Sequence, residues 1–213
     1  GGRLERIRSR VIEAVLPDRQ AAATTFLASM PDSYVLSTPE EVIPSHSELR
    51  RRFGEREAAG ERPAMAIHVA HFPERDFSEF AVCTRDRPGL FAMLSGVLAA
   101  HSMNILAARI ATSFDGIALD AFRISQSSAE ASLDEERWER LEHTLRRVLG
   151  GELDVEDLVR RAQRPSLLAR PRRRVPTSIE IDNSVSRDCT VLDVYTGDRV
   201  GLLFTITNCL YHL

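Results

Sequence analysis

A seven-residue phrase occurs twice in this chain of 213 residues, as TRDRPGL at residues 84–90 and as TGDRVGL at residues 196–202. The Asp, Gly and Leu of the two copies are each 112 positions apart, so the copies superpose without a gap. Each copy follows a run with strand character and precedes an apolar run with helical spacing. Such an internal repeat predicts two related modules. Only residues 203–213 follow the second phrase, so we expect the first half of a second module.

Composition places the chain among globular proteins and argues against several classes of partner. Hydrophobic residues make up 43% of it, and the formal net charge is −3, which gives no general attraction to nucleic acid. All 28 basic residues are arginines, which excludes lysine-dependent chemistry. No apolar run approaches the roughly 20 residues of a membrane-spanning helix. We therefore expect no nucleic acid partner, no membrane association and a cytoplasmic location.

No catalytic or metal site is predicted. The six histidines are scattered, and His68 and His71 would point to opposite faces of a strand. The three cysteines, Cys83, Cys189 and Cys209, are odd in number and far apart, which favours reduced core residues over a disulfide or zinc site. We assign no catalytic residue and no metal ligand.

The first 60 residues predict a helical lead-in. Apolar residues recur at helical spacing from Leu4 to Val15, and Pro17 ends this first helix. A second helix is expected over residues 19–29. Residues 37–41 (STPEE) indicate a helix N-terminus, with Ser37 or Thr38 as the N-cap of a third helix that reaches about residue 53. Residues 54–63 then mark a boundary.

From residue 61 the pattern predicts alternating strands and helices. Strands are expected around residues 65–69, 79–84, 104–112 and 117–124, with an Asp115-Gly116 hairpin turn between the last two. Helices are expected over residues 88–101 and 133–149, both on one face of a single antiparallel sheet. Residues 152–163 look helical. The fold class is therefore α+β.

The domain boundaries follow from these patterns. We expect a helical lead-in at residues 1–60, a first α+β domain at 61–163, an arginine- and proline-rich linker at 164–176, and a truncated second domain at 177–213. The second domain begins with a strand at 178–182, a turn at 183–184 and a strand at 189–196.

The repeated phrase has the chemistry of a small-anion site. Pro88 favours the first helical turn, Gly89 lets a ligand approach the backbone, and the N–H groups of a helix N-terminus attract a carboxylate. Asp86 could accept an ammonium group there. A purely structural interpretation remains open, in which Asp86 caps the helix, Gly89 permits close helix-on-sheet packing and Arg87 is solvated.

Residues 80–126 resemble an ACT domain, through the phrase at 84–91, the run LAAHSMNI at 98–105 and the turn at 115–116. The resemblance implies a βαββαβ, ferredoxin-like fold that binds free amino acids between paired modules. It implies the following ligand-binding residues: Asp86, Arg87, Pro88, Gly89, Leu90, Asn104 and Ile105 in the first copy, and Asp198, Arg199, Gly201 and Leu202 in the second. Val200 stands where the first copy has Pro88.

The tandem arrangement and residues 30–42 resemble the C-terminal portion of the bifunctional uridylyltransferase/uridylyl-removing enzymes that modify the nitrogen regulator PII. The resemblance covers nearly the whole chain. It implies an upstream nucleotidyltransferase domain that attaches UMP to PII and a metal-dependent HD hydrolase domain that removes it, with Mg and UTP bound upstream. The lead-in would be the end of the HD domain or the coupling helices beyond it. The resemblance also implies that the ACT pair senses glutamine and regulates the upstream domains, so that this chain carries no catalytic residues itself.

Two other interpretations remain open. The ACT module could regulate another amino-acid-controlled enzyme. Alternatively, the modules could be purely structural and self-associate through their sheets to form dimers.

Overall fold

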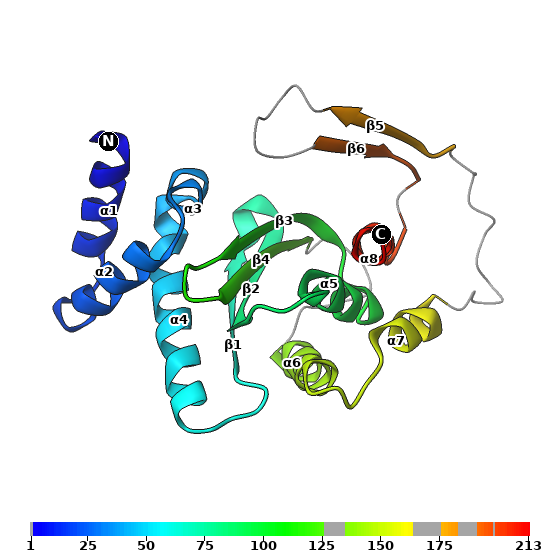
Figure 1. The fold of residues 1–213 in the computed structure, drawn as a ribbon, viewed down its shortest axis with the longest axis horizontal. Coiled ribbons are helices and arrows are strands. Elements are labelled where there is room, and N and C mark those ends of the chain that lie inside the picture. Colours follow the sequence, from blue (N-terminus) through cyan, green and yellow to red (C-terminus); the bar gives the residue numbers. More distant parts are fainter. Residues whose placement is uncertain (1, 126–134, 164–175, 183–190, 198) are drawn as a thin grey trace.

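The computed structural model describes residues 2–125, 135–163, 176–182, 191–197 and 199–213. Helices come first, followed by a four-stranded antiparallel sheet with ferredoxin-like alternation of helix and strand, and then by a two-stranded sheet (Figure 1). The predicted fold class is confirmed.

Residues 2–60 fold into four α-helices, and apolar periodicity predicted three of them. The lead-in comprises α1 (Gly2–Ala14), α2 (Gln20–Ser29), α3 (Asp32–Ser37) and α4 (Ile43–Ala58), with 3-10 turns at Pro17–Arg19 (η1) and Glu40–Val42 (η2). The short helix α3 was not predicted.

Two local predictions in the lead-in are wrong. Neither η2 nor α4 has a side-chain N-cap, because Ser37 still belongs to α3 and Pro39 precedes η2. The Thr38 hydroxyl is buried without a hydrogen-bond partner in the described part of the chain. The third helix does not end near residue 53, since α4 continues through Gly54 to Ala58. A glycine costs a helix only about 1 kcal/mol, and packing of α4 on the sheet overrides it.

The sheet contains β1 (Met65–Phe72), β2 (Phe77–Arg85), β3 (Ile105–Thr112) and β4 (Ile117–Ser125) in the order β1-β2-β4-β3, with all neighbours antiparallel. A 3-10 turn at Pro73–Arg75 (η3) joins β1 to β2. The predicted turn at Gly116 joins β3 to β4, with φ of 76° at the glycine and a hydrogen bond from its N–H to the Ser113 carbonyl.

The edge strand beside β2 is β1, which comes before β2 in the chain. In the βαββαβ pattern, the strand after the second helix lies beside the first strand of the pattern. Here the pattern begins with β2, and its edge neighbour is β1. The chain after the second helix instead forms α7 (Val155–Ala162), as residues 152–163 predicted. The N-terminal hairpin thus completes the sheet.

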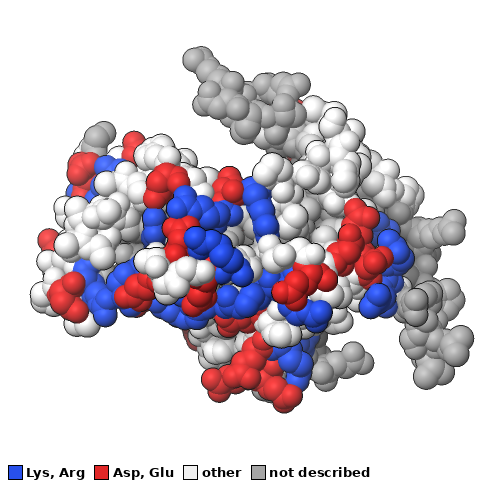
Figure 2. Space-filling view, turned by 60° about the horizontal axis from the view of Figure 1, so that its bottom comes forward, with Lys and Arg blue, Asp and Glu red and all other residues white. Residues whose placement is uncertain are grey.

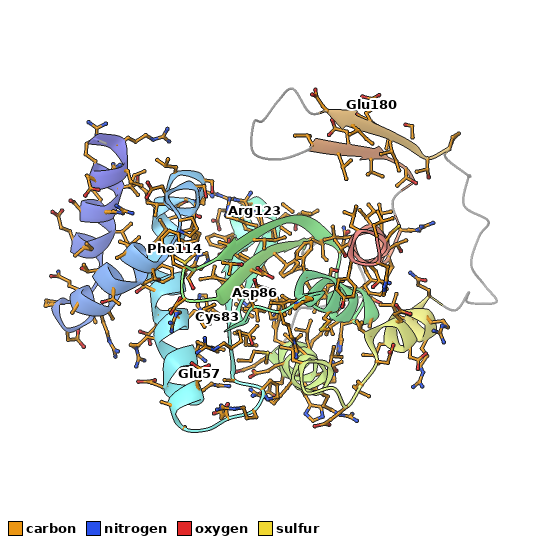
Figure 3. All side chains as sticks on the ribbon, in the orientation of Figure 1. Glu57, Cys83, Asp86, Phe114, Arg123 and Glu180 are labelled. Atoms are coloured by element: carbon orange, nitrogen blue, oxygen red, sulfur yellow. The ribbon has the colours of Figure 1, made fainter. Side chains whose placement is uncertain are left out.

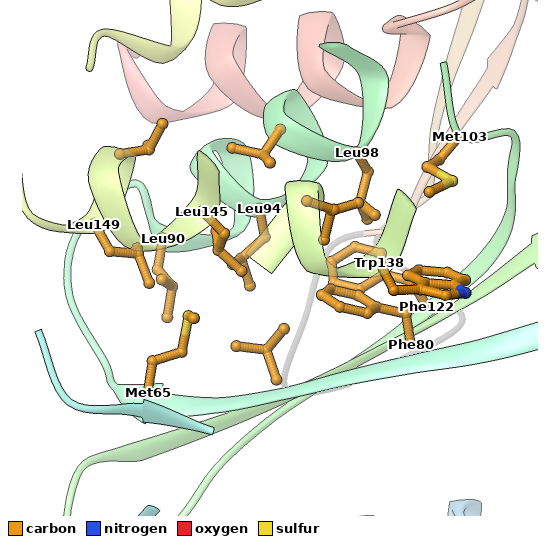
Figure 4. Packing of buried hydrophobic residues seen from close by; sticks show 14 of the residues in the cluster. Met65, Phe80, Leu90, Leu94, Leu98, Met103, Phe122, Trp138, Leu145 and Leu149 are labelled. Carbon is orange, nitrogen blue, oxygen red and sulfur yellow. The ribbon is translucent and has the colours of Figure 1, made fainter. Parts of the chain in front are cut away.

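Helices α5 (Leu90–Ala100) and α6 (Glu135–Leu149) cover one face of the sheet, as predicted. The Trp138 ring of α6 stacks on Phe80 with centroids 5.6 Å apart, and Phe91 of α5 stacks on Phe122 at the same distance. Figure 4 shows this core, in which leucines of α5 and α6 meet Met65 and the aromatic side chains of the strands.

The opposite face of the sheet is covered by the lead-in, which the sequence did not predict. Leu49 and Phe53 of α4 pack against Ala66, Ala81 and Cys83. Small side chains on this face let the helix lie close to the strands. The sheet is therefore the middle of three layers, with α4 on one side and α5 and α6 on the other (Figure 1).

The second copy contributes β5 (Ser178–Asp182), β6 (Val191–Tyr195) and α8 (Leu202–Tyr211). β5 and β6 form an antiparallel pair, and α8 packs on α5 through a small cluster that includes Phe204 and Ala92.

Several predictions lie outside the described residues: the start of the α6 helix at 133–134, nearly all of the linker at 164–176, the turn at 183–184, Cys189 and Asp198. Of the described cysteines, Cys83 is a buried free thiol, as predicted. The prediction for Cys209 is wrong, because this thiol is exposed while other residues of α8 pack on α5.

Candidate functional site

The two copies of the phrase adopt the same local structure. Gly89 and Gly201 directly precede α5 and α8 with φ of 75° and 78°, a conformation that favours glycine. The N–H of Leu90 bonds the Arg87 carbonyl at 3.1 Å, and the N–H of Leu202 bonds the Arg199 carbonyl at 3.1 Å. The sequence repeat is therefore also a structural repeat.

Helices α5 and α8 pack antiparallel about an approximate two-fold axis. The hydroxyls of Ser95 and Thr207, which are equivalent in the repeat, lie 3.4 Å apart. A Cβ added to Gly89 would lie 3.3 Å from the Tyr211 ring, and one added to Gly201 would lie 3.7 Å from the Cβ of Ala99. Because Tyr211 and Ala99 are also 112 positions apart, these contacts are reciprocal.

Two hollows follow from this symmetry, each between the phrase of one copy and the helix of the other. The Asp86 pocket, about 350 Å³, lies between the first phrase and the end of α8, and is lined by Asp86, Gly89, Thr112, Asp120 and Tyr211 among others. The Arg199 pocket, about 410 Å³, lies between the second phrase and the end of α5, and is lined by Arg199, Gly201, Ser95, Asn104 and Ile105 among others. Both volumes suit a small ligand.

The predicted ligand-binding residues divide between these two pockets. Asp86, Arg87, Gly89 and Leu90 line the Asp86 pocket. Asn104 and Ile105, however, line the Arg199 pocket together with Arg199, Gly201 and Leu202 of the second copy. Pro88 is not among the lining residues of either, and Asp198 lies outside the described residues.

Asp86 does not cap α5. The residue before α5 is Gly89, and no side chain caps this helix. The Asp86 carboxylate instead accepts a hydrogen bond from the Thr112 hydroxyl at 3.3 Å, and its backbone N–H donates to the Gly116 carbonyl. Figure 3 shows Asp86 near the end of β2. The structural alternative for this residue is therefore wrong.

Arg87 is exposed, as the structural interpretation expected, but it is also anchored, because its Nη2 donates to the Leu149 carbonyl at the end of α6, at 2.7 Å. Partial burial lowers the pKa of this guanidinium from its usual value. Arg87 thus satisfies a carbonyl at a helix C-terminus.

Asp120 is a site residue that the sequence analysis missed. It lies on β4 opposite Val82 and lines the Asp86 pocket, with 1% of its surface exposed. Burial, reinforced by the negative charge of Asp86, raises the pKa of its carboxyl to about 7. The sequence pattern could have revealed it, because an acid at position 120 lies on the same face of the strand as Ala118, Phe122 and Ile124, which point into the core.

Curated relatives match most of this chain. The proteins from Rhodospirillum rubrum and Gluconobacter oxydans are each 35% identical to it, over 95% and 70% of the chain, and the matches cover 21% and 16% of those proteins. A protein from Novosphingobium aromaticivorans is 28% identical over 99% of the chain, which covers 22% of that protein. All three are named bifunctional uridylyltransferase/uridylyl-removing enzyme.

This chain is homologous to a part of such bifunctional enzymes. It spans about a fifth of the length of these uridylyltransferase/uridylyl-removing relatives. No protein-family model matches the chain, and no solved structure matches it.

A buried polar chain joins the lead-in of this uridylyltransferase homologue to its sheet. The Tyr34 hydroxyl lies 2.8 Å from Nδ1 of His46, and His46 Nε2 lies 3.3 Å from the Glu79 carboxylate on β2. Burial opposes ionisation of Glu79, but the hydrogen bond and charge of His46, aided by Arg109 and Arg123, hold its pKa below its usual value. His46 is thus a fully buried connecting residue.

A second connection lies next to the repeated phrase. Arg85, the last residue of β2, donates from Nε and Nη2 to the two carboxylate oxygens of Glu57 on α4, at 2.6 and 2.8 Å. The loop that lines the Asp86 pocket is therefore held to the lead-in through a bidentate ion pair.

The described residues contain no group of three or more His, Cys, Asp or Glu side chains that could hold a metal ion. Among the same residues, no helix is long and apolar enough to cross a membrane. Figure 2 shows basic and acidic side chains interspersed over one face of the molecule, in keeping with the small net charge.

Proposed function

We propose that this chain is the regulatory, glutamine-sensing portion of a bifunctional uridylyltransferase/uridylyl-removing enzyme that modifies the PII protein in the cytoplasm. The observation that carries the proposal is the pair of symmetry-related pockets between the two copies of the phrase. The name of the relatives, bifunctional uridylyltransferase/uridylyl-removing enzyme, indicates the chemistry of the parent enzyme. The ferredoxin-like domain and its repeat would then be a pair of ACT domains.

The Asp86 pocket suits a free amino acid because it combines two opposite charge preferences. The N-terminus of α5, which follows Gly89, favours an α-carboxylate through its helix dipole and N–H groups. Asp86 lies in the same pocket and can accept an α-ammonium group. The remaining apolar lining, such as Phe91 and Leu210, would contact the aliphatic part of a glutamine side chain.

Regulation requires that glutamine bind one arrangement of the parent enzyme more tightly than another. The ion pair of Arg85 with Glu57 and the chain from Glu79 to Tyr34 join the sheet to the lead-in helices. A ligand that shifts the phrase would therefore act on α4 directly. Upstream domains would bind Mg and UTP and carry out transfer to PII and removal from it.

Isothermal titration of the chain with glutamine tests this proposal, with glutamate, serine and leucine as controls. We expect heat of binding for glutamine alone. Equal binding of another amino acid would favour a regulator of a different enzyme. No binding of any of the four would favour a structural pair of modules, and dimerisation measured by analytical ultracentrifugation would support that interpretation.

A further inference from the structure

Asp120 is an acid in a place that normally holds an apolar side chain. Its neighbours on the same face of β4, Ala118 and Phe122, belong to the core between the sheet and α5. Its side chain therefore points from the sheet toward α5, where it lines the Asp86 pocket. A buried carboxyl group is costly unless it is paired.

No partner offsets that cost among the described residues. Oδ1 of Asp120 is buried and has no hydrogen-bond partner there. The basic residue that lines the same pocket, Arg87, donates instead to the Leu149 carbonyl. The nearby Asp86 adds a second negative charge. The pocket thus presents two carboxyl groups and lacks a cation to match them.

The missing cation is better explained by an organic ammonium group than by a metal ion. A calcium ion takes six to eight oxygen ligands, and magnesium demands about six in octahedral geometry, whereas the described residues form no group of three suitable side chains. An ammonium group has three N–H donors, which matches two carboxyl groups and one further acceptor. The Thr112 hydroxyl, already bonded to Asp86, lines the same pocket.

We propose that the carboxylates of Asp120 and Asp86 together accept hydrogen bonds from the α-ammonium group of the bound amino acid. The Asp86 pocket would therefore be the principal amino-acid site. This inference rests on the proposed amino-acid sensing function. In the Arg199 pocket the residue equivalent to Asp86 is Asp198, which lies outside the described residues. The assignment of the principal site therefore rests on Asp120, which lines the Asp86 pocket.

The test combines one substitution with one change of ligand. Asp120→Asn removes the charge and keeps the shape. Asp76→Asn is the matched control, since it also removes one carboxylate but at an exposed turn with φ of 54°, which asparagine tolerates. The ligands are glutamine, glutaramate, which lacks the α-amino group, and serine. Titrations are made at about pH 8, where Asp120 is mostly ionised, and thermal melts confirm that each variant folds.

A charge-assisted hydrogen bond contributes about 1.5–3 kcal/mol, so we expect Asp120→Asn to weaken glutamine binding about 10- to 100-fold. Glutaramate should bind the wild-type chain about as weakly as Asp120→Asn binds glutamine. Its affinity for the wild-type chain and for Asp120→Asn should be the same, because glutaramate lacks the group that Asp120 contacts. Asp76→Asn should bind glutamine as the wild-type chain does.

The inference is overturned if Asp120→Asn binds glutamine unchanged, or if it weakens glutamine and glutaramate equally. Glutamine sensing would survive either of those results. Conversely, the wild-type chain could bind serine and not glutamine, with serine binding abolished by Asp120→Asn. That result would support the ammonium site and contradict glutamine sensing. Failure of the wild-type chain to bind any amino acid overturns both.

Discussion

Replacing Asp120 by asparagine should stabilise the unliganded chain at and above about pH 7 and change little below about pH 4. The carboxyl group is 1% exposed, and its pKa is raised from 3.8 to about 7 by burial and by the charge of Asp86. The unfolded chain loses this proton near its ordinary pKa, whereas the folded chain keeps it until about pH 7. The folded state therefore loses stability as the pH rises between those two values.

The size of the effect follows from the same pKa. A change from 3.8 to about 7, at about 1.4 kcal/mol for each pKa unit, corresponds to about 4 kcal/mol at pH 8. This value is an upper bound, because the asparagine amide is also a buried polar group that requires hydrogen bonds. We expect a net gain of about 1–4 kcal/mol in the free energy of unfolding at pH 8.

Urea denaturation of both proteins at a series of pH values between about 4 and 8 measures this difference. Groups far from Asp120 are unaffected by the substitution, so the difference between the curves reports the Asp120 carboxyl and its interaction with Asp86. The difference should grow with pH and level off above about pH 7. Parallel pH profiles would refute the reasoning, since they would mean that the Asp120 carboxylate is already compensated in the folded state.

Two further substitutions and one control test the contacts between the two copies. Gly96→Ala would place a Cβ against Val155 of α7 and 2.8 Å from the Phe204 ring of α8, so it should lower the free energy of unfolding by about 1–3 kcal/mol despite the better helix propensity of alanine. An unchanged or higher urea midpoint would contradict the close packing of α7 and α8 on α5. Gly89→Ala and Gly151→Ala both place alanine at φ near +76°, at a cost of about 1–2 kcal/mol, but only Gly89 lies against the ring of the second copy. We therefore expect similar losses of stability in melts and a loss of glutamine binding in Gly89→Ala alone; equal binding losses would show that backbone strain, rather than the pocket, is responsible.

Much of the fold could be predicted because the chain repeats a local pattern. The Asp115-Gly116 turn, the alternation of the strands and the helices after each phrase depend on neighbours in sequence, and these are what turn chemistry and periodicity report. The φ values of Gly89 and Gly201 confirm that both phrases form the same junction.

The remaining features depend on contacts between distant residues. The sequence did not predict that α4 covers one face of the sheet. This face carries alanines and Cys83, and such small residues are compatible with either a packed or an exposed face. The division of the predicted site between two pockets likewise follows from the antiparallel packing of α8 on α5, which brings Tyr211 to Gly89. Asp120 was overlooked because its strand was read from its apolar residues.

Hydrogen exchange of the chain with and without glutamine tests the central claim most directly, because it locates the ligand as well as detecting it. The account predicts slower exchange at residues 86–93 and 207–211, which surround the Asp86 pocket. Slower exchange confined to the Arg199 pocket would assign sensing to the other copy. No change in either segment, at a glutamine concentration that saturates binding, would contradict an amino-acid site between the two copies of the phrase.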